Sequence, residues 1–158
     1  MKRDTMPTDT DRIERSIVIN APRERVWQAL TDTAKFSAWF KADLTGQTFA
    51  PGQRVRGPIS VSGYEHLFLD LVVDRVEAPS LFSYRWHPAA IDPAVDYSGE
   101  EPTLVTFTLQ DAPGNGTLVT IVESGFDKVP PHRRLDAFRM NGNGWDAQMD
   151  NLLRYASA

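Results

Sequence analysis

The longest regular pattern of apolar positions lies near the C-terminus, from residue 132 to residue 157. Its apolar or small residues recur at steps of three and four, which is the spacing of one face of an α-helix: Leu135, Phe138, Gly142, Trp145, Met149, Leu152 and Ala156. Two prolines, at 130 and 131, suit the first turn of a helix and mark where it begins. The pattern therefore predicts one long amphipathic helix over this range.

Two glycines, Gly142 and Gly144, interrupt the predicted helix. Each costs about 1 kcal/mol relative to alanine in a helix interior, which leaves open a loop between two shorter helices. The apolar spacing keeps its phase across both glycines, and this favours one helix. A glycine on the buried face would then leave room for a strand, a bound molecule or a kink.

The remaining patterns predict a strand, two short helices and then a series of strands. Alternating residues predict the first strand, at 13–20, with one face formed by Ile13, Arg15, Ile17 and Ile19. Helical spacing predicts a helix of about ten residues after Pro22 and a short turn that ends in Phe36, Trp39 and Phe40. Short β-type segments separated by Gly and Pro predict an antiparallel sheet, with strands near 44–49, 54–61, 65–77, 81–87, 102–111 and 116–125.

This order of elements predicts an α+β fold in which the C-terminal helix covers the apolar face of the sheet. Residues 1–12 are polar and show no periodicity, so we expect a disordered tail. The rest, 13–158, is long enough for a single domain with one core, since 41% of the 158 residues are hydrophobic.

Composition and charge narrow the function classes. The formal net charge of -4 disfavours a nucleic-acid partner. The chain has neither an apolar segment of membrane-spanning length nor the apolar region of a signal peptide, so we expect a cytoplasmic protein without a membrane span. It has no cysteine, its three histidines lack metal-ligand spacing, and it has no P-loop or GxGxxG motif. We therefore expect neither a metal nor a cofactor.

Glu123 is the most informative single residue. It shares strand parity with Val119 and Ile121 and should point inward, where an ionised carboxylate is costly unless it is paired. It would then be protonated, bonded to a partner, or poised as a ligand anchor or general base. The alternative is a carboxylate at the strand end that reaches water or pairs with an arginine.

The segment 88–102 carries only acidic charges, from Asp92, Asp96, Glu100 and Glu101. A solvated acidic loop is the simplest interpretation. The functional alternative is a mobile lid over the mouth of a cavity.

Several short motifs occur together and in order: Ile19-Asn20-Ala21-Pro22 with Val26-Trp27, Trp39-Phe40, Pro51-Gly52, Val76-Glu77-Ala78-Pro79 leading into Tyr84-Arg85-Trp86, Glu123-Ser124-Gly125-Phe126, and Gly144-Trp145 with Met149. Together they resemble the START-like (SRPBCC) superfamily, and within it the branch named after the activator of the heat-shock-protein-90 ATPase. The resemblance covers residues 13–156. It departs from the usual pattern at Ala78, where a second proline is common.

The resemblance implies a helix-grip fold, in which a curved antiparallel sheet of about six to seven strands surrounds the C-terminal helix and leaves a cavity between them. The cavity would then be lined by large aromatic residues and one carboxylate: Trp39, Phe40, Phe68, Tyr84, Trp86, Phe107, Glu123, Trp145 and Met149. The alternative for each aromatic residue is an ordinary core position.

The resemblance leaves three functions open, because the fold determines the pocket and not the chemistry. The first is non-catalytic binding of a hydrophobic or aromatic small molecule, such as a lipid, in a closed cavity of about 300 to 1,000 Å³. The second is a polyketide-cyclase-like or hydrolytic enzyme with Glu123 as acid or base, assisted by Tyr84 or His66. The third is a chaperone-binding module. We also expect a homodimer, the commonest assembly of soluble proteins.

Overall fold

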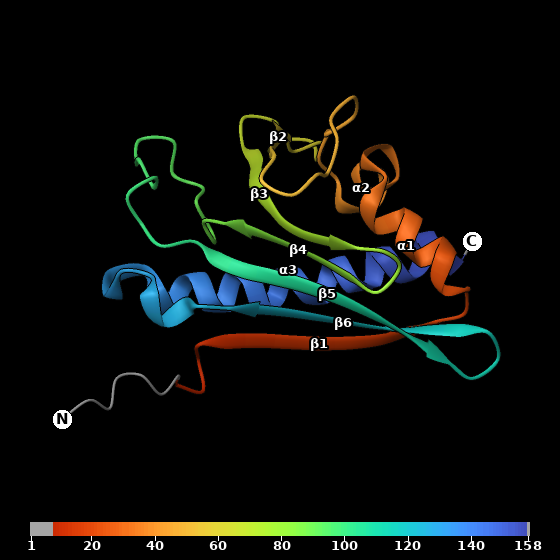
Figure 1. The fold of residues 1–158 in the computed structure, drawn as a ribbon. Helices are drawn as coiled ribbons and strands as arrows, with labels where there is room; N and C mark the ends of the chain where they lie inside the picture. The colour runs from red at the N-terminus through yellow and green to blue at the C-terminus, as the bar shows by residue number, and fades with distance from the viewer. Residues whose placement is uncertain (1–7, 158) are drawn as a thin grey trace.

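The computed structural model describes residues 8–157 and shows one curved six-stranded antiparallel sheet with a long helix along one face (Figure 1). The strand order is β1-β6-β5-β4-β3-β2. In chain order the elements are β1 (Arg12–Ile19), α1 (Arg23–Thr31), α2 (Thr33–Phe40), β2 (Arg54–Pro58), β3 (Phe68–Glu77), β4 (Leu81–Trp86), β5 (Thr103–Ala112), β6 (Gly116–Ser124), the short 3-10 helix η1 (Phe126–Lys128) and α3 (Pro131–Ser157). This is the predicted helix-grip arrangement, with six strands.

The helix α3 is continuous over its 27 residues, so the predicted single helix is confirmed and the alternative of two helices is wrong. Gly142 is buried and faces β1, where a Cβ atom would lie 3.5 Å from Nη2 of Arg15. The glycine thus leaves room for a strand side chain. Leu135, expected on the buried face, is 49% exposed, because α3 first contacts the core at Ala137.

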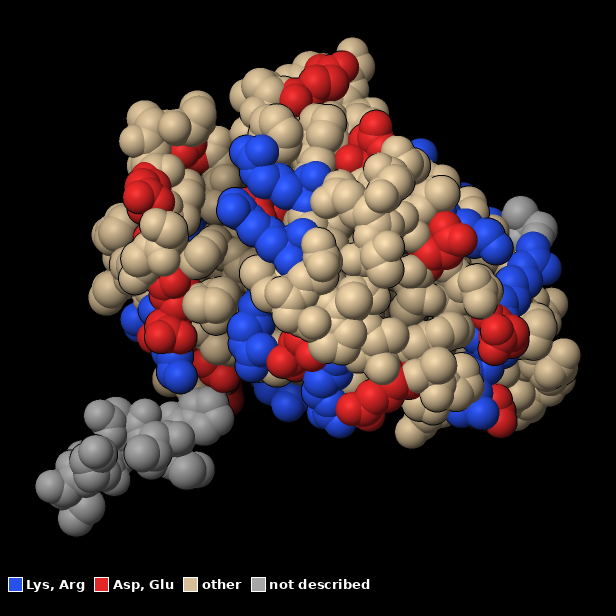
Figure 2. Space-filling view, turned by 45° about the horizontal axis from the view of Figure 1, so that its top comes forward, with Lys and Arg blue, Asp and Glu red and all other residues tan. Residues whose placement is uncertain are grey.

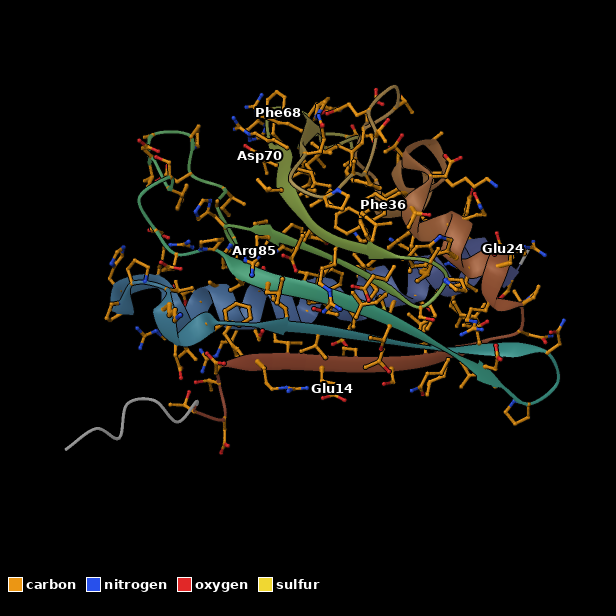
Figure 3. The ribbon with its side chains drawn as sticks, in the orientation of Figure 1. Glu14, Glu24, Phe36, Phe68, Asp70 and Arg85 are labelled. Atoms are coloured by element: carbon orange, nitrogen blue, oxygen red, sulfur yellow. The ribbon has the colours of Figure 1, made fainter. Side chains whose placement is uncertain are left out.

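The two short helices predicted after the first strand are present as α1 and α2, and they lie at one end of the sheet (Figure 1). Asp32 caps α2, because its carboxylate accepts hydrogen bonds from the backbone N–H groups of Ala34 and Lys35 at 2.9 and 3.1 Å. The helix ends at Lys41, which has the left-handed backbone conformation with a φ of 69°. Phe36 is fully buried and lies in the aromatic core at this end of the sheet (Figure 3).

The predicted strand at 44–49 is wrong. This segment makes no ladder with the sheet, and only an isolated bridge pairs nearby Ala42 with Ile59. The chain instead passes close over β2, where a Cβ atom on Gly57 would lie 1.8 Å from the carbonyl oxygen of Asp43. Leu44 and Phe49 are buried in the core although they belong to an irregular segment. Their apolar side chains explain why the sequence of this segment resembled that of a strand.

Strand pairing places Tyr84 of β4, Val105 of β5 and Glu123 of β6 side by side in one row on the buried face of the sheet. Of the predicted tail, residues 1–7 lie outside the described range. Thr8 is joined to the domain, because its backbone N–H and its hydroxyl donate to the carboxylate of Asp127 at 2.9 and 2.6 Å.

Candidate functional site

A groove of about 310 Å³ opens beside the middle of α3. The end of α2, the segment after β2, the end of β4 and one side of α3 form its walls. Its lining residues are Phe40, Lys41, Ile59, Val61, Trp86, Asn141, Gly144, Trp145, Ala147, Gln148 and Asn151. We call it the aromatic groove, because three large rings lie together in its lining.

These three rings come from three separate elements. Trp86 of β4 and Trp145 of α3 stack with ring centroids 5.7 Å apart and planes 30° apart. Phe40 of α2 contacts both at a centroid distance of 6.2 Å with its edge or face turned toward them. Trp145 and Phe40 are nearly buried, whereas Trp86 is half-buried. The groove therefore presents an aromatic surface assembled from one helix end, one strand end and α3.

Glu123 lies behind this surface and holds both tryptophans. Its side chain is fully buried, and its two oxygens accept hydrogen bonds from the indole nitrogens of Trp86 at 2.7 Å and Trp145 at 2.8 Å. Because both indole N–H groups are bound to Glu123, neither is free for a ligand, and the rings are fixed in orientation.

Two further donors complete the carboxylate's shell. The hydroxyl of Thr103 donates at 2.5 Å, and the amide nitrogen of Asn141 lies 2.9 and 3.0 Å from the two oxygens. Indole and amide nitrogens can only donate, so both oxygens of Glu123 accept hydrogen bonds. The predicted inward orientation of Glu123 is confirmed, and the alternative of a carboxylate that reaches water or pairs with an arginine is wrong.

The hydroxyl of Tyr84 is buried, as Glu123 is, but unlike Glu123 it has no hydrogen-bond partner within residues 8–157. Burial raises the pKa of Tyr84 well above its ordinary value, and the negative charge of Glu123 raises it further. His66 is exposed in the loop before β3. The enzyme hypothesis gave Glu123 an assistant in Tyr84 or His66. Tyr84 lies in the same buried row as Glu123, but within residues 8–157 its hydroxyl makes no hydrogen bond to that carboxylate, and His66 is exposed.

The other predicted site residues lie outside the groove. Trp39, Phe107 and Met149 are at most 3% exposed in the core, where the Trp39 indole donates to the Ala29 carbonyl at 2.8 Å. Phe68 is 47% exposed on the outer side of β3, with the guanidinium of Arg56 3.9 Å from its ring centroid (Figure 3).

The expected closed cavity is thus an open groove. Tyr84, Phe82 and Phe107 contact one another and fill much of the space between sheet and helix. Of the nine predicted site residues, Phe40, Trp86 and Trp145 line the groove. Alternation along a strand indicates which side chains point inward, but it does not indicate whether inward space is filled.

The predicted site residues include none of the polar side chains that line the groove. Asn141 and Gln148 line the groove together with Trp145, and the three residues occupy positions i, i+7 and i+4 of one helix face. That spacing would have identified them. The side-chain amide of Gln148 donates to the carbonyl oxygen of Phe40 at 2.8 Å and so joins α3 to the end of α2.

The acidic segment 88–102 does not border the groove. Arg133 of α3 holds it in place, with ion-pair contacts to Glu100 as short as 2.6 Å and a hydrogen bond of 2.8 Å to the carbonyl oxygen of Pro88. The Arg133 guanidinium also lies 4.7 Å from the ring centroid of Tyr97. The segment is therefore a tethered loop beside the start of α3, and the alternative of a lid over the groove is not what the structure shows.

The described part of the chain contains neither a metal-binding cluster nor a membrane-spanning helix. Within residues 8–157, no group of three or more His, Asp and Glu side chains is arranged to hold a metal ion. No helix in the same range combines the length and the apolar character needed to cross a membrane.

Solved structures share this fold over nearly the whole chain. Protein MLL2253 from Mesorhizobium loti is 30% identical, with a TM-score of 0.69 over 91% of this chain and 95% of that chain. NE0264 from Nitrosomonas europaea is 16% identical, with a TM-score of 0.71 over 96% and 97%. CalU16 from Micromonospora echinospora is 21% identical, with a TM-score of 0.61 over 92% and 76%.

Comparison with curated proteins gives no match. The family model described as activator of Hsp90 ATPase homolog 1-like protein matches residues 20–157, which include every element from α1 to α3. This match and the helix-grip fold confirm the START-like resemblance. The chain therefore belongs to the activator of Hsp90 ATPase homolog 1-like family.

Proposed function

We propose that this protein binds a hydrophobic or aromatic small molecule in the aromatic groove and carries out no chemistry on it. The observation that supports this proposal is the stacked pair Trp86 and Trp145, whose indoles are fixed by one buried carboxylate. Preorganised aromatic surfaces bind flat apolar ligands at a low entropic cost, because the rings are already in place.

The lining of the groove favours a small, mostly apolar ligand. A volume of about 310 Å³ lies at the lower end of the range of small-molecule pockets, so the ligand would have one or two rings. The amide nitrogens of Asn141, Gln148 and Asn151 are all engaged with protein acceptors, which leaves few donors for a polar ligand.

Glu123 is better suited to positioning than to acid-base catalysis. It accepts hydrogen bonds from four side chains and does not line the groove, so it has no path to a proton on a bound molecule. We therefore favour the binding hypothesis over a cyclase-like or hydrolytic enzyme.

Native mass spectrometry and tryptophan fluorescence together test the proposal. We expect a mass retained from purification, or saturable quenching by members of a panel of aromatic and fatty ligands. Trp86→Ala should weaken binding at least about tenfold, because it removes one face of the stacked pair. Trp27→Phe is the matched control, since Trp27 lies on α1 and does not line the groove.

An unliganded protein that no member of the panel quenches would contradict the proposal. So would equal loss of affinity in the two variants, because the binding would then not depend on the groove.

A second candidate function is a protein-docking role of the kind that the family description names. Phe68 and Val72 are 47% and 43% exposed on the outer face of the sheet, beside Arg54, Arg56 and Arg85. Figure 2 shows Lys and Arg side chains on this side of the molecule, among residues that carry no charge and a few acidic side chains. Apolar side chains framed by arginines are typical of protein interfaces.

This second candidate has less support, because Asp70 already pairs with Arg54 and Asp74 with Arg85. Its test is the ATPase rate of a heat-shock protein 90 chaperone on mixing. We would expect an increase that Phe68→Ala abolishes and Trp86→Ala does not, and an unchanged rate would exclude the docking role.

A further inference from the structure

A second groove lies where β1 meets α3. It also has a volume of about 310 Å³, but its lining is mostly polar and carries three arginines: Arg12, Ile13, Glu14, Arg15, Phe138, Arg139, Gly142 and Asn143. We call it the arginine groove. None of its lining residues belongs to the aromatic groove.

Two irregular features of the sequence meet in this groove. Arg15 interrupts the apolar face of β1, and Gly142 interrupts the apolar face of α3. In the structure they lie opposite each other, with Nη2 of Arg15 3.5 Å from the position of a Cβ atom on Gly142. The absence of a side chain at Gly142 therefore leaves room for the guanidinium of Arg15. The interface between β1 and α3 thus contains a cation at a position where two apolar side chains would otherwise pack.

The charges of the groove do not cancel. Arg15 pairs with Asp146 at 2.6 Å, and Arg12 pairs with Glu14, whose position on β1 Figure 3 shows. Arg139 makes no ion pair with any of residues 8–157. Three arginines thus face two carboxylates on a protein whose formal net charge is -4.

Both ion pairs are exposed, with side-chain exposures of 37% to 60%, so they can be exchanged for other partners at little cost. A guanidinium presents parallel N–H donors that match the two oxygens of a carboxylate or a phosphate. Asn143 adds a side-chain amide at the same groove.

We propose that the arginine groove binds the carboxylate or phosphate group of a small molecule. Arg139 supplies the uncompensated charge, Arg15 supplies a guanidinium held in position by β1 and Gly142, and Arg12 closes the outer end. This site is separate from the aromatic groove, so it does not depend on the function proposed above.

Isothermal titration calorimetry of the full chain at low ionic strength tests this proposal, with inorganic phosphate and citrate as the two probes. We expect saturable binding of at least one probe, about tenfold weaker in Arg139→Gln and weakened by added salt. Arg25→Gln is the matched control, because Arg25 is an exposed arginine on α1 and its loss changes the net charge equally. It should bind as the unchanged protein does.

The two probes distinguish the chemistry, since binding of citrate alone would identify a carboxylate site and binding of phosphate alone a phosphate site. Arg139→Lys, which keeps the charge but not the paired donors, should retain part of the affinity. Circular dichroism checks that each variant is folded. Lack of saturable binding by both probes would overturn the proposal, as would equal affinities of Arg139→Gln and Arg25→Gln.

Discussion

The aromatic groove and the arginine groove have the same volume and share the helix α3, yet they are built in opposite ways. The aromatic groove rests on a buried carboxylate with four hydrogen-bond donors, whereas the arginine groove rests on ion pairs exposed to solvent. Four consecutive residues of α3 serve both: Asn141 and Gly144 line the first groove, and Gly142 and Asn143 line the second. One helical segment thus separates an apolar site from a charged one.

The largest expected effect on stability comes from Glu123, the buried carboxylate behind the aromatic groove. Glu123→Gln places an amide N–H₂ group against indole and amide donors, so at least one buried donor loses its acceptor. We expect the free energy of unfolding to fall by about 2 to 4 kcal/mol in urea denaturation. Glu24→Gln, at an exposed position of α1, is the control and should change this free energy by less than about 0.5 kcal/mol. Equal small effects of both variants would refute the role assigned to Glu123.

The two glycines of α3 give the next largest expected effect on stability. A Cβ atom added to Gly144 would have no neighbouring atom within 4 Å, so Gly144→Ala should raise the free energy of unfolding by about 1 kcal/mol through helix propensity alone. Gly142→Ala should gain less, because its Cβ would contact Arg15. Thermal denaturation of both variants checks the order, and a larger gain at 142 than at 144 would contradict the geometry.

The exposed ion pair of Arg15 in the arginine groove predicts a small effect on stability. Arg15→Gln removes an ion pair with side-chain exposures of 37% and 60%, and should lower the free energy of unfolding by no more than about 1 kcal/mol. The loss should shrink further in high salt. A loss as large as that of Glu123→Gln would mean that the arginine groove is a structural element of the core.

The smallest expected effect at neutral pH is that of Tyr84→Phe. Within residues 8–157 the buried Tyr84 hydroxyl has no hydrogen-bond partner, so its removal should lower the free energy of unfolding by less than about 0.5 kcal/mol. A loss well above 1 kcal/mol would show that the hydroxyl has a partner after all.

The same residue predicts behaviour in alkali. Burial, and then the charge of Glu123, raise the pKa of Tyr84 above its ordinary value of 10.0, so the unfolded chain loses this proton first. The contribution of Tyr84 to stability is therefore complete below pH 10 and is lost as the pH rises above that value. Tyr84→Phe should be less sensitive to pH in this range, and identical alkaline denaturation of both proteins would contradict the assignment.

The sequence predicted the elements well where one face of a pattern is continuous. Sequence periodicity predicted the long C-terminal helix, the inward orientation of Glu123 and five of the six strands expected between residues 43 and 125. These predictions hold because the structure buries the face that the periodicity marks. The strand at 44–49 failed because Leu44 and Phe49 are buried from an irregular segment, and apolar residues at short spacing do not distinguish the two cases.

The site was harder to predict than the fold. Trp39, Tyr84, Phe107 and Met149 point inward as expected, but whether inward side chains surround a cavity or fill it depends on how they meet across elements. The arginine groove depends on the opposition of Arg15 and Gly142, which lie 127 positions apart and are each only a local irregularity in the sequence.

The measurement that tests the central claim most directly is a titration monitored through the indole N–H resonances of the four tryptophans by NMR. Trp86 and Trp145 donate to Glu123 and line the aromatic groove, whereas Trp39 donates to Ala29 in the core and Trp27 lies on α1. An aromatic or fatty ligand should shift the signals of Trp86 and Trp145 saturably and leave that of Trp27 unchanged, while phosphate should shift neither groove tryptophan. If no ligand of the panel shifts Trp86 and Trp145, or if all four tryptophans respond alike, the aromatic groove is not a binding site.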